Sequence, residues 1–156
     1  MSKLNIHFSG YIKYAPEKCI GCGVCMLACS LYHESAINPA LSRITLYKDA
    51  FEGDHKIEVC VQCYSPGCYT ICPVKAVKID GRTGATYIDE KICIGCGLCM
   101  KACPLMPKQQ VIKFKIFENK RIYYKCDLCK DRTEGPICVE LCPTKALKYI
   151  TGVDRF

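Results

Sequence analysis

The chain has 156 residues, of which 16 are cysteine and none is tryptophan. So high a cysteine content argues against a domain stabilised by an apolar core alone, and is typical of small proteins held together by disulfides or metal ions. The formal net charge of +7 by itself favours an acidic partner such as nucleic acid.

The start of the chain does not favour the disulfide explanation. Residues 1–13 contain no apolar segment of the kind found in export signals. The longest apolar run, 24–31, is interrupted by Ser30 and is too short to span a bilayer. We therefore expect reduced cysteines in a cytoplasmic protein of a cell that lives with little oxygen, and no membrane insertion.

The first cysteine group, 19–29, reads C-x2-C-x2-C-x3-C, which is the spacing of bacterial ferredoxins. In this motif a trio of closely spaced thiolates holds three irons of one [4Fe-4S] cluster, and the last, single cysteine serves another cluster. Gly21 and Gly23 allow the loop to wrap closely around a cluster. A helix is predicted over 23–31 and a long loop over 30–42.

The second group, 60–72, is preceded by two segments with strand-like alternation, 43–47 and 56–59. It reads C-x2-C-x4-C-x3-C-P and therefore has a longer loop before its third cysteine. A short helix is predicted over 66–72, where the proline after the last cysteine fits a helix end.

A hairpin made of 76–79 and 86–88 is predicted next, around an Asp-Gly turn. The third group, 93–103, returns to the compact spacing of the first and is followed by a proline. A helix is predicted over 97–103.

A second hairpin is predicted from 111–117 and 121–124. The fourth group, 126–142, reads C-x2-C-x8-C-x3-C-P, with a helix predicted over 136–142. The loop 130–135 is charged and could contact a partner, but a solvated loop is the favoured interpretation.

All 16 cysteines fall into these four groups, and the order compact, long, compact, long repeats with halves near 15–80 and 89–150. The expected fold class is α+β: a duplicated bacterial-ferredoxin-like fold with four [4Fe-4S] clusters, short helices and β-hairpins. We expect one folded unit over 1–156, because no low-complexity linker separates the halves.

Zinc is the rival metal, since paired C-x2-C motifs also form zinc sites. Such sites use two pairs around one ion, whereas these groups have a third cysteine at close spacing and a fourth three residues on. The pattern therefore favours clusters, and a zinc-stapled binding module stays as an alternative.

Clusters also change the meaning of the net charge. An oxidised [4Fe-4S] cluster with four thiolates adds about −2 relative to neutral cysteines. Four clusters would bring the formal charge of +7 to about −1, so the basic residues are read as compensation and nucleic acid is not expected as a partner.

The rule that the single cysteine crosses to another cluster leaves two pairings open. The groups pair locally, first with second and third with fourth, or they nest, second with third and first with fourth. Connector lengths do not decide between the two.

The cysteine pattern over 19–148 resembles the four-cluster ferredoxin-like subunits of molybdenum and tungsten oxidoreductases, such as the electron-transfer subunit of dimethyl sulfoxide reductase. The short length and the segments 29–34, 38–39 and 42–44 are similar to the small subunits of tungsten aldehyde-oxidoreductase-type enzymes. One departure is Ser30, which stands where a proline is expected after the first group and affects the helix end there.

The resemblance implies nested pairing. The inner ferredoxin module would then be 56–104, and the outer module 1–50 plus 105–156. The four implied ligand sets are Cys19, Cys22 and Cys25 with Cys142; Cys60, Cys63 and Cys68 with Cys103; Cys93, Cys96 and Cys99 with Cys72; and Cys126, Cys129 and Cys138 with Cys29.

The function implied is that of a non-catalytic electron-transfer subunit, which passes single electrons between a larger catalytic subunit with a tungsten or molybdenum pterin cofactor and an acceptor. A further redox subunit or a soluble ferredoxin is the expected second partner. The alternative is a free polyferredoxin carrier that serves several redox enzymes.

No catalytic constellation and no other cofactor site is expected. His33 lies just after Cys29 and could hydrogen-bond near a cluster, but a structural or exposed histidine is the favoured interpretation. The ten tyrosines are expected to pack around the clusters.

Overall fold

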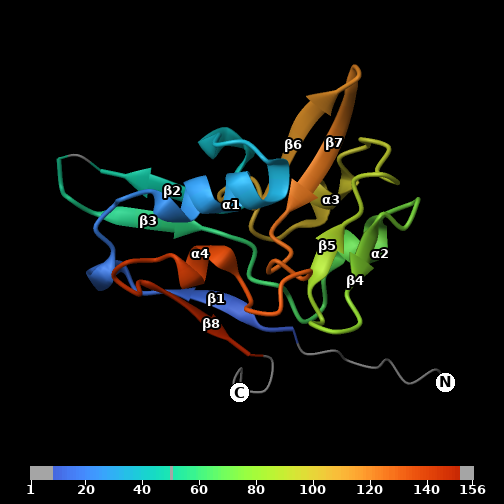
Figure 1. The fold of residues 1–156 in the computed structure, drawn as a ribbon. Helices are drawn as coiled ribbons and strands as arrows, with labels where there is room; N and C mark the ends of the chain where they lie inside the picture. The colour runs from blue at the N-terminus through green and yellow to red at the C-terminus, as the bar shows by residue number, and fades with distance from the viewer. Residues whose placement is uncertain (1–8, 50, 152–156) are drawn as a thin grey trace.

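A computed structural model describes residues 9–49 and 51–151 of the chain (Figure 1). Residues 1–8, which contribute to the expectation about export, lie outside this range. The strands pair two by two into antiparallel sheets, with orders β1-β8, β2-β3, β4-β5 and β6-β7. The elements in chain order are β1 (Tyr11–Tyr14), η1 (Pro16–Lys18), α1 (Val24–Glu34), η2 (Pro39–Leu41), β2 (Thr45–Lys48), β3 (His55–Glu58), α2 (Gly67–Ile71), β4 (Val77–Ile79), β5 (Thr86–Ile88), α3 (Leu98–Ala102), β6 (Ile112–Phe117), β7 (Lys120–Lys125), α4 (Ile137–Glu140) and β8 (Leu147–Ile150).

These elements form two assemblies with the same composition. In one, β4 pairs with β5, and α2 packs against α3. In the other, β8 pairs with β1, and α1 packs against α4, so this assembly is built from the two ends of the described chain. Figure 1 shows the assemblies side by side, with the β6-β7 hairpin projecting between them.

The backbone after the two long cysteine motifs is also the same in both assemblies. Lys75 and Lys145 each have a φ of 54°. The alanines that follow, Ala76 and Ala146, are each 2% exposed, and each leads into a strand. The repeated Cys-Pro-x-Lys-Ala sequence therefore corresponds to a repeated local structure.

The predicted hairpins and helices are confirmed to within a few residues. β4-β5 and β6-β7 occupy the two predicted hairpin segments, and β2 and β3 fall on the two segments predicted as strands before the second group. The four helices begin within a residue or two of the predicted starts. None of the helices in the described ranges has the length and apolarity needed to cross a membrane.

The prediction of a loop over 30–42 is wrong at both ends. α1 continues to Glu34, and η2 forms a helical turn at Pro39–Leu41. The reason is Ser30, which has a backbone N–H for the helix where a proline would have none. Its hydroxyl donates to the Leu27 carbonyl oxygen at 3.1 Å and accepts from the N–H of Asn38 at 3.1 Å, which ties the following loop to the helix.

The expectation that the tyrosines pack around the clusters holds for only part of the set. Tyr123 and Tyr124 are buried, at 5% and 1% exposure. Other tyrosines lie at the surface, where the polar end of the ring meets water. The surface tyrosines include Tyr32, Tyr47, Tyr64 and Tyr69.

Candidate metal centres

The first trio of cysteines lies on the loop that leads into α1, and the structure places Cys142 of the fourth group beside it. Cys19, Cys22, Cys25 and Cys142 all line one cavity. Burial raises the pKa of the Cys25 thiol to about 11, and the neighbouring Cys22, Cys19 and Cys142 raise it as well. Four sulfur atoms from two ends of the chain therefore converge at this place.

The second trio converges with the single cysteine of the third group. Cys60, Cys63, Cys68 and Cys103 line one cavity, at the contact between α2 and α3. The pKa of Cys68 is raised to about 11 by burial, with further contributions from Cys60, Cys103 and Cys63.

The third trio surrounds the start of α3. Burial raises the pKa of Cys99 to about 11, and both Cys93 and Cys96 of the same trio add to the shift. Cys72 lies at the end of α2, the helix that packs on α3, and its sulfur accepts a hydrogen bond from the N–H of Ala76 at 3.2 Å. The packing of α2 on α3 places Cys72 near this trio.

The fourth trio is the most deeply buried, and α1 brings Cys29 to it. Burial raises the pKa of Cys138, and Cys29 and Cys129 raise it further. Burial raises the pKa of Cys129 to about 12, again with a contribution from Cys29. The packing of α1 on α4 accounts for this meeting of residues far apart in the sequence.

The donor sets fit iron–sulfur clusters better than single zinc ions. The sulfurs of a tetrahedral zinc site lie about 3.8 Å apart. Over the described residues, which include all 16 cysteines, the sole group of three or more His, Cys, Asp or Glu ligand atoms that all lie within 4.8 Å of one another is His33, Asp127 and Cys129. Each cysteine set is therefore spread more widely than one ion requires, as a multi-iron core would need.

Hydrogen bonds to sulfur support the same conclusion, because backbone N–H groups commonly stabilise cluster thiolates. The N–H of Arg43 donates to the Cys29 sulfur at 3.3 Å, and that of Leu128 to the Cys126 sulfur at 3.5 Å. The buried thiols have raised pKa values, so they need a positively charged core to be thiolates at neutral pH.

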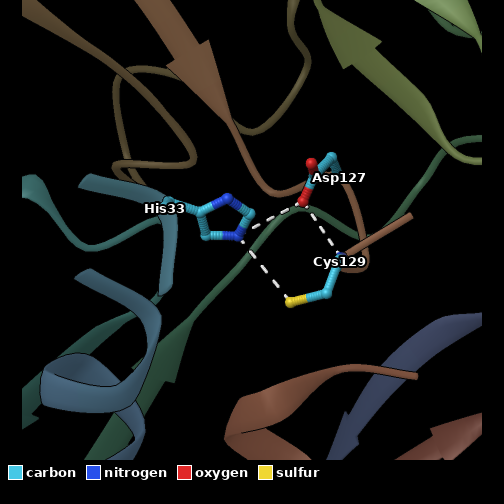
Figure 2. Close-up of side chains that lie close together, drawn as sticks. All are labelled: His33, Asp127 and Cys129. Atoms are coloured by element: carbon cyan, nitrogen blue, oxygen red, sulfur yellow. Dashed lines mark hydrogen bonds and ion pairs between the residues drawn. The ribbon is translucent and has the colours of Figure 1, made fainter. Parts of the chain in front are cut away.

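The side chain of His33 is largely buried beside the fourth trio, so the interpretation as an exposed histidine is wrong and the alternative of a contact near a cluster site is supported (Figure 2). Its Nε2 lies 3.7 Å from the Cys129 sulfur and 3.4 Å from an oxygen of Asp127. Burial lowers the pKa of His33 to about 4, and the positive charge of Arg43 lowers it as well, whereas Asp127 acts in the opposite direction. The ring is therefore neutral at pH 7.

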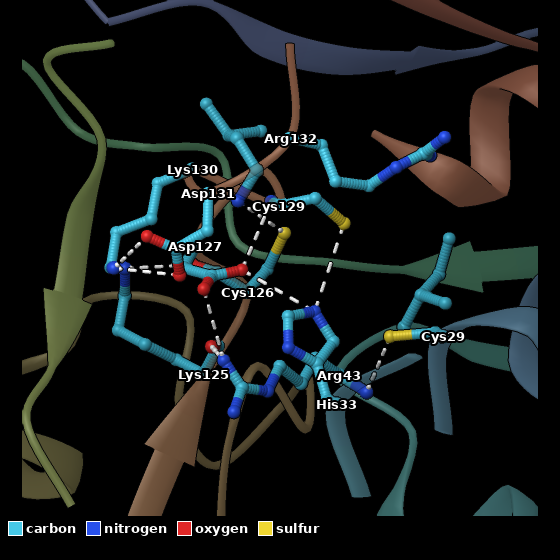
Figure 3. A network of polar contacts seen from close by, with 12 residues as sticks. Cys29, His33, Arg43, Lys125, Cys126, Asp127, Cys129, Lys130, Asp131 and Arg132 are labelled. Atoms are coloured by element: carbon cyan, nitrogen blue, oxygen red, sulfur yellow. Dashed lines mark hydrogen bonds and ion pairs between the residues drawn. The ribbon is translucent and has the colours of Figure 1, made fainter. Parts of the chain in front are cut away.

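Arg43 and Asp127 form a polar network around this trio that sequence patterns did not indicate (Figure 3). Arg43 contacts Asp127 at 3.3 Å and Glu90 at 2.9 Å, and donates to the Lys125 carbonyl oxygen at 3.5 Å. Asp127 also accepts from the N–H of Cys129 at 3.0 Å. The one available signal was that Asp127 stands between two cysteines of a C-x2-C pair.

Lys125 and Gln62 were also missed, and both are buried between the second and fourth trios. Gln62 is 1% exposed; its amide donates to the Cys126 carbonyl oxygen at 2.8 Å, and its side-chain oxygen accepts from the N–H of Thr86 at 2.9 Å. Lys125 is 2% exposed and lines the cavity of the second trio.

The four trios follow one another in space in the order third, second, fourth, first. Electrostatic interactions between neighbouring trios join Cys99 to Cys68, Cys126 to Cys60, and Cys138 to Cys25. Two cysteines are exposed, Cys96 in the third trio and Cys22 in the first. The series therefore begins and ends at the protein surface, and in its two inner trios every cysteine except the half-buried Cys63 is buried.

The sequence matches two family descriptions, a 4Fe-4S dicluster domain over residues 51–151 and a 4Fe-4S binding domain over residues 12–30. An "aliphatic sulfonate oxidoreductase, polyferredoxin-like subunit" from Pyrococcus furiosus is 39% identical, over 93% of this chain and 80% of the relative. The "electron transport protein HydN" of Escherichia coli is 33% identical, over 84% of this chain and 82% of the relative. The "NADH-dependent phenylglyoxylate dehydrogenase subunit beta" of Aromatoleum evansii is 35% identical, over 93% of this chain and 31% of the relative.

Proposed function

Because this chain belongs to the 4Fe-4S dicluster domain family, we propose that it is the electron-transfer subunit of an oxidoreductase complex and relays single electrons through four [4Fe-4S] clusters. The observation that carries the proposal is the series of four trios that begins and ends at an exposed cysteine. Such a series suits the transport of electrons between two partners.

We propose nested ligation. The cavities shared by the first trio with Cys142 and by the second trio with Cys103 support it, as do the interactions of Cys29 with the fourth trio. For Cys72 the support is the packing of α2 on α3. The assigned sets are the four named from the resemblance, with an inner module over 56–104 and an outer module over 1–50 plus 105–156.

The chain's own residues prepare these sites. Clusters, when bound, supply reversible one-electron storage. Backbone N–H groups such as that of Arg43 direct positive dipoles at the sulfurs, and burial of the fourth trio and of Cys60 and Cys68 limits the access of water to the middle of the series. Exposed cysteines leave the two end sites within reach of a docked partner.

The partner in this proposal is a larger catalytic subunit with a tungsten or molybdenum pterin cofactor, in a cytoplasmic complex of an oxygen-poor cell. The resemblance of the cysteine pattern to subunits of such enzymes supports this choice. The relative named as a subunit of an aliphatic sulfonate oxidoreductase is in line with a catalytic partner. All 16 cysteines are free, as a reducing compartment requires.

Anaerobic purification of the chain from cells that also produce its partners tests the proposal. We expect about 16 iron and 16 sulfide per chain, and a larger chain in fixed ratio that contains tungsten or molybdenum. About 12 irons per chain would mean that one cysteine set does not hold a four-iron cluster. Substantial zinc would contradict the proposal. A chain with full iron that comes out alone would instead be a free carrier.

A further inference from the structure

We propose that Lys125 is a fixed positive charge shared by the second and fourth trios, and that it raises the reduction potentials of the two inner clusters relative to the two outer ones. This inference rests on the proposed function. It assigns a role to a residue that binds no metal and contacts no substrate.

The position of Lys125 places its ammonium between the two inner trios. The residue ends β7 directly before Cys126 (Figure 3), and its side chain lines the cavity that contains Cys60, Cys63, Cys68 and Cys103. The ammonium donates to the carbonyl oxygen of Thr86 on β5 and, at 3.1 Å, to that of Cys126. The side chain thus bridges from the fourth trio to the second.

No carboxylate neutralises this ammonium among the residues that the structure describes. The nearest acid in sequence, Asp127, is engaged by Arg43 at 3.3 Å and by His33 at 3.4 Å. Two other lysines differ in this respect: Lys78 pairs with Asp89 at 2.7 Å, and Lys115 with Glu34 at 2.6 Å. A buried charge without a partner is strongly unfavourable, so an anion is expected in the adjoining cavity.

Thiolates provide that anionic environment. Cys60 and Cys68 line the same cavity as the Lys125 side chain, and Cys126 follows Lys125 directly in the chain. Those three cysteines belong to the two inner trios and to neither outer one. Their thiolates would stabilise the ammonium when clusters are bound, and the field of the ammonium acts mainly on the inner sites.

A fixed cation beside a cluster favours the reduced form, because reduction adds a negative charge that the cation stabilises. The effect is large here since the site is buried and weakly screened. The clusters of the second and fourth trios, on both sides of the boundary between the two assemblies, should accordingly be reduced first. The outer clusters, next to exposed Cys22 and Cys96, would be filled last and would exchange electrons with partners.

Redox titration of the iron-loaded chain, followed by electron paramagnetic resonance, tests the proposal with Lys125→Met. The reduced-to-oxidised ratio of two clusters at a fixed potential should fall at least tenfold, a shift of about 59 mV for one electron, and the other two should stay unchanged. Lys125→Arg, which keeps the charge, should restore most of the shift. Lys78→Met is the matched control, because it removes a lysine paired at the surface, and it should shift no cluster.

A fully loaded Lys125→Met chain with four unshifted potentials overturns the proposal. Should that variant not load clusters, wild-type protein labelled with 15N at the lysine side-chain nitrogen decides the matter. Nuclear coupling from such a nitrogen to the reduced clusters is expected, and its absence overturns the proposal. Iron short of four clusters in the wild type would count against the proposed function, whereas full iron without a Lys125 effect counts against this inference alone.

Discussion

Gly95, in the loop of the third trio, has a φ of +74°, and a Cβ at this position would overlap the carbonyl oxygen of Arg121 on β7. Gly53 has a nearly identical φ of +73°, but nothing lies within 4 Å of the place where its Cβ would be. Gly95 is therefore required for two reasons, the left-handed backbone and the close approach of β7. Gly53 is required only for the left-handed backbone.

The pair gives a matched test at the residue scale. Gly53→Ala should destabilise the loaded protein by about 1 kcal/mol, the usual cost of a left-handed alanine. Gly95→Ala should cost about 1–3 kcal/mol more because β7 or the loop has to move. Thermal midpoints of the two loaded variants, measured without air, check this. Equal losses would show that β7 does not approach the loop so closely.

At the scale of elements, the outer assembly is formed by pieces from both ends of the described chain. β1 pairs with β8 in the register Tyr11 with Ile150 and Tyr14 with Leu147, and α1 packs on α4. Cys29 lies on α1, so the packing of α1 on α4 places it beside the fourth trio and away from the first. The nested ligation proposed above is thus a consequence of helix packing.

Nested ligation makes a prediction about paired variants. Cys29→Ala should lose up to about four of 16 irons, and adding Cys129→Ala should remove little more because both residues belong to one cluster. Adding Cys63→Ala should instead remove a further cluster, since independent sites add. Iron assays of the single and double variants decide. Local pairing would predict the reverse, with Cys29 and Cys63 behaving as one site.

At the scale of the whole molecule, cysteine takes the place of much of the aliphatic core. Of the 25 buried hydrophobic residues among those described, nine are cysteines. Polar bridges join the assemblies, including Arg43 with Glu90 at 2.9 Å and Lys115 with Glu90 at 2.7 Å. With so little apolar surface, metal binding should supply a large part of the folding free energy.

Removal of iron by a chelator under reducing conditions should therefore unfold most of the chain in one transition. Loss of the far-ultraviolet circular dichroism signal should follow loss of iron with the same time course. The control is a chain kept without chelator in the same buffer. An apoprotein that keeps its secondary structure and a sharp thermal transition would show that the apolar core suffices.

The sequence by itself determined the features that depend on neighbours along the chain. Cysteine spacing specified the four motifs, the turn at Asp80–Gly84 marked one hairpin, and prolines marked helix ends, because loop geometry and turn chemistry act over a few residues. The chain order of the motifs also indicated an internal repeat. In the structure, Lys75 and Lys145, which occupy equivalent positions in the two halves, have the same φ.

Only the tertiary structure decided which distant segments meet. The sequence did not predict β1 and β8, because no hairpin turn joins them and their pairing brings together segments more than a hundred residues apart. Lys125 reads as one more surface lysine in the sequence. Its burial follows from the approach of β5 and of the second trio to the end of β7, and no local pattern encodes an approach between segments so far apart.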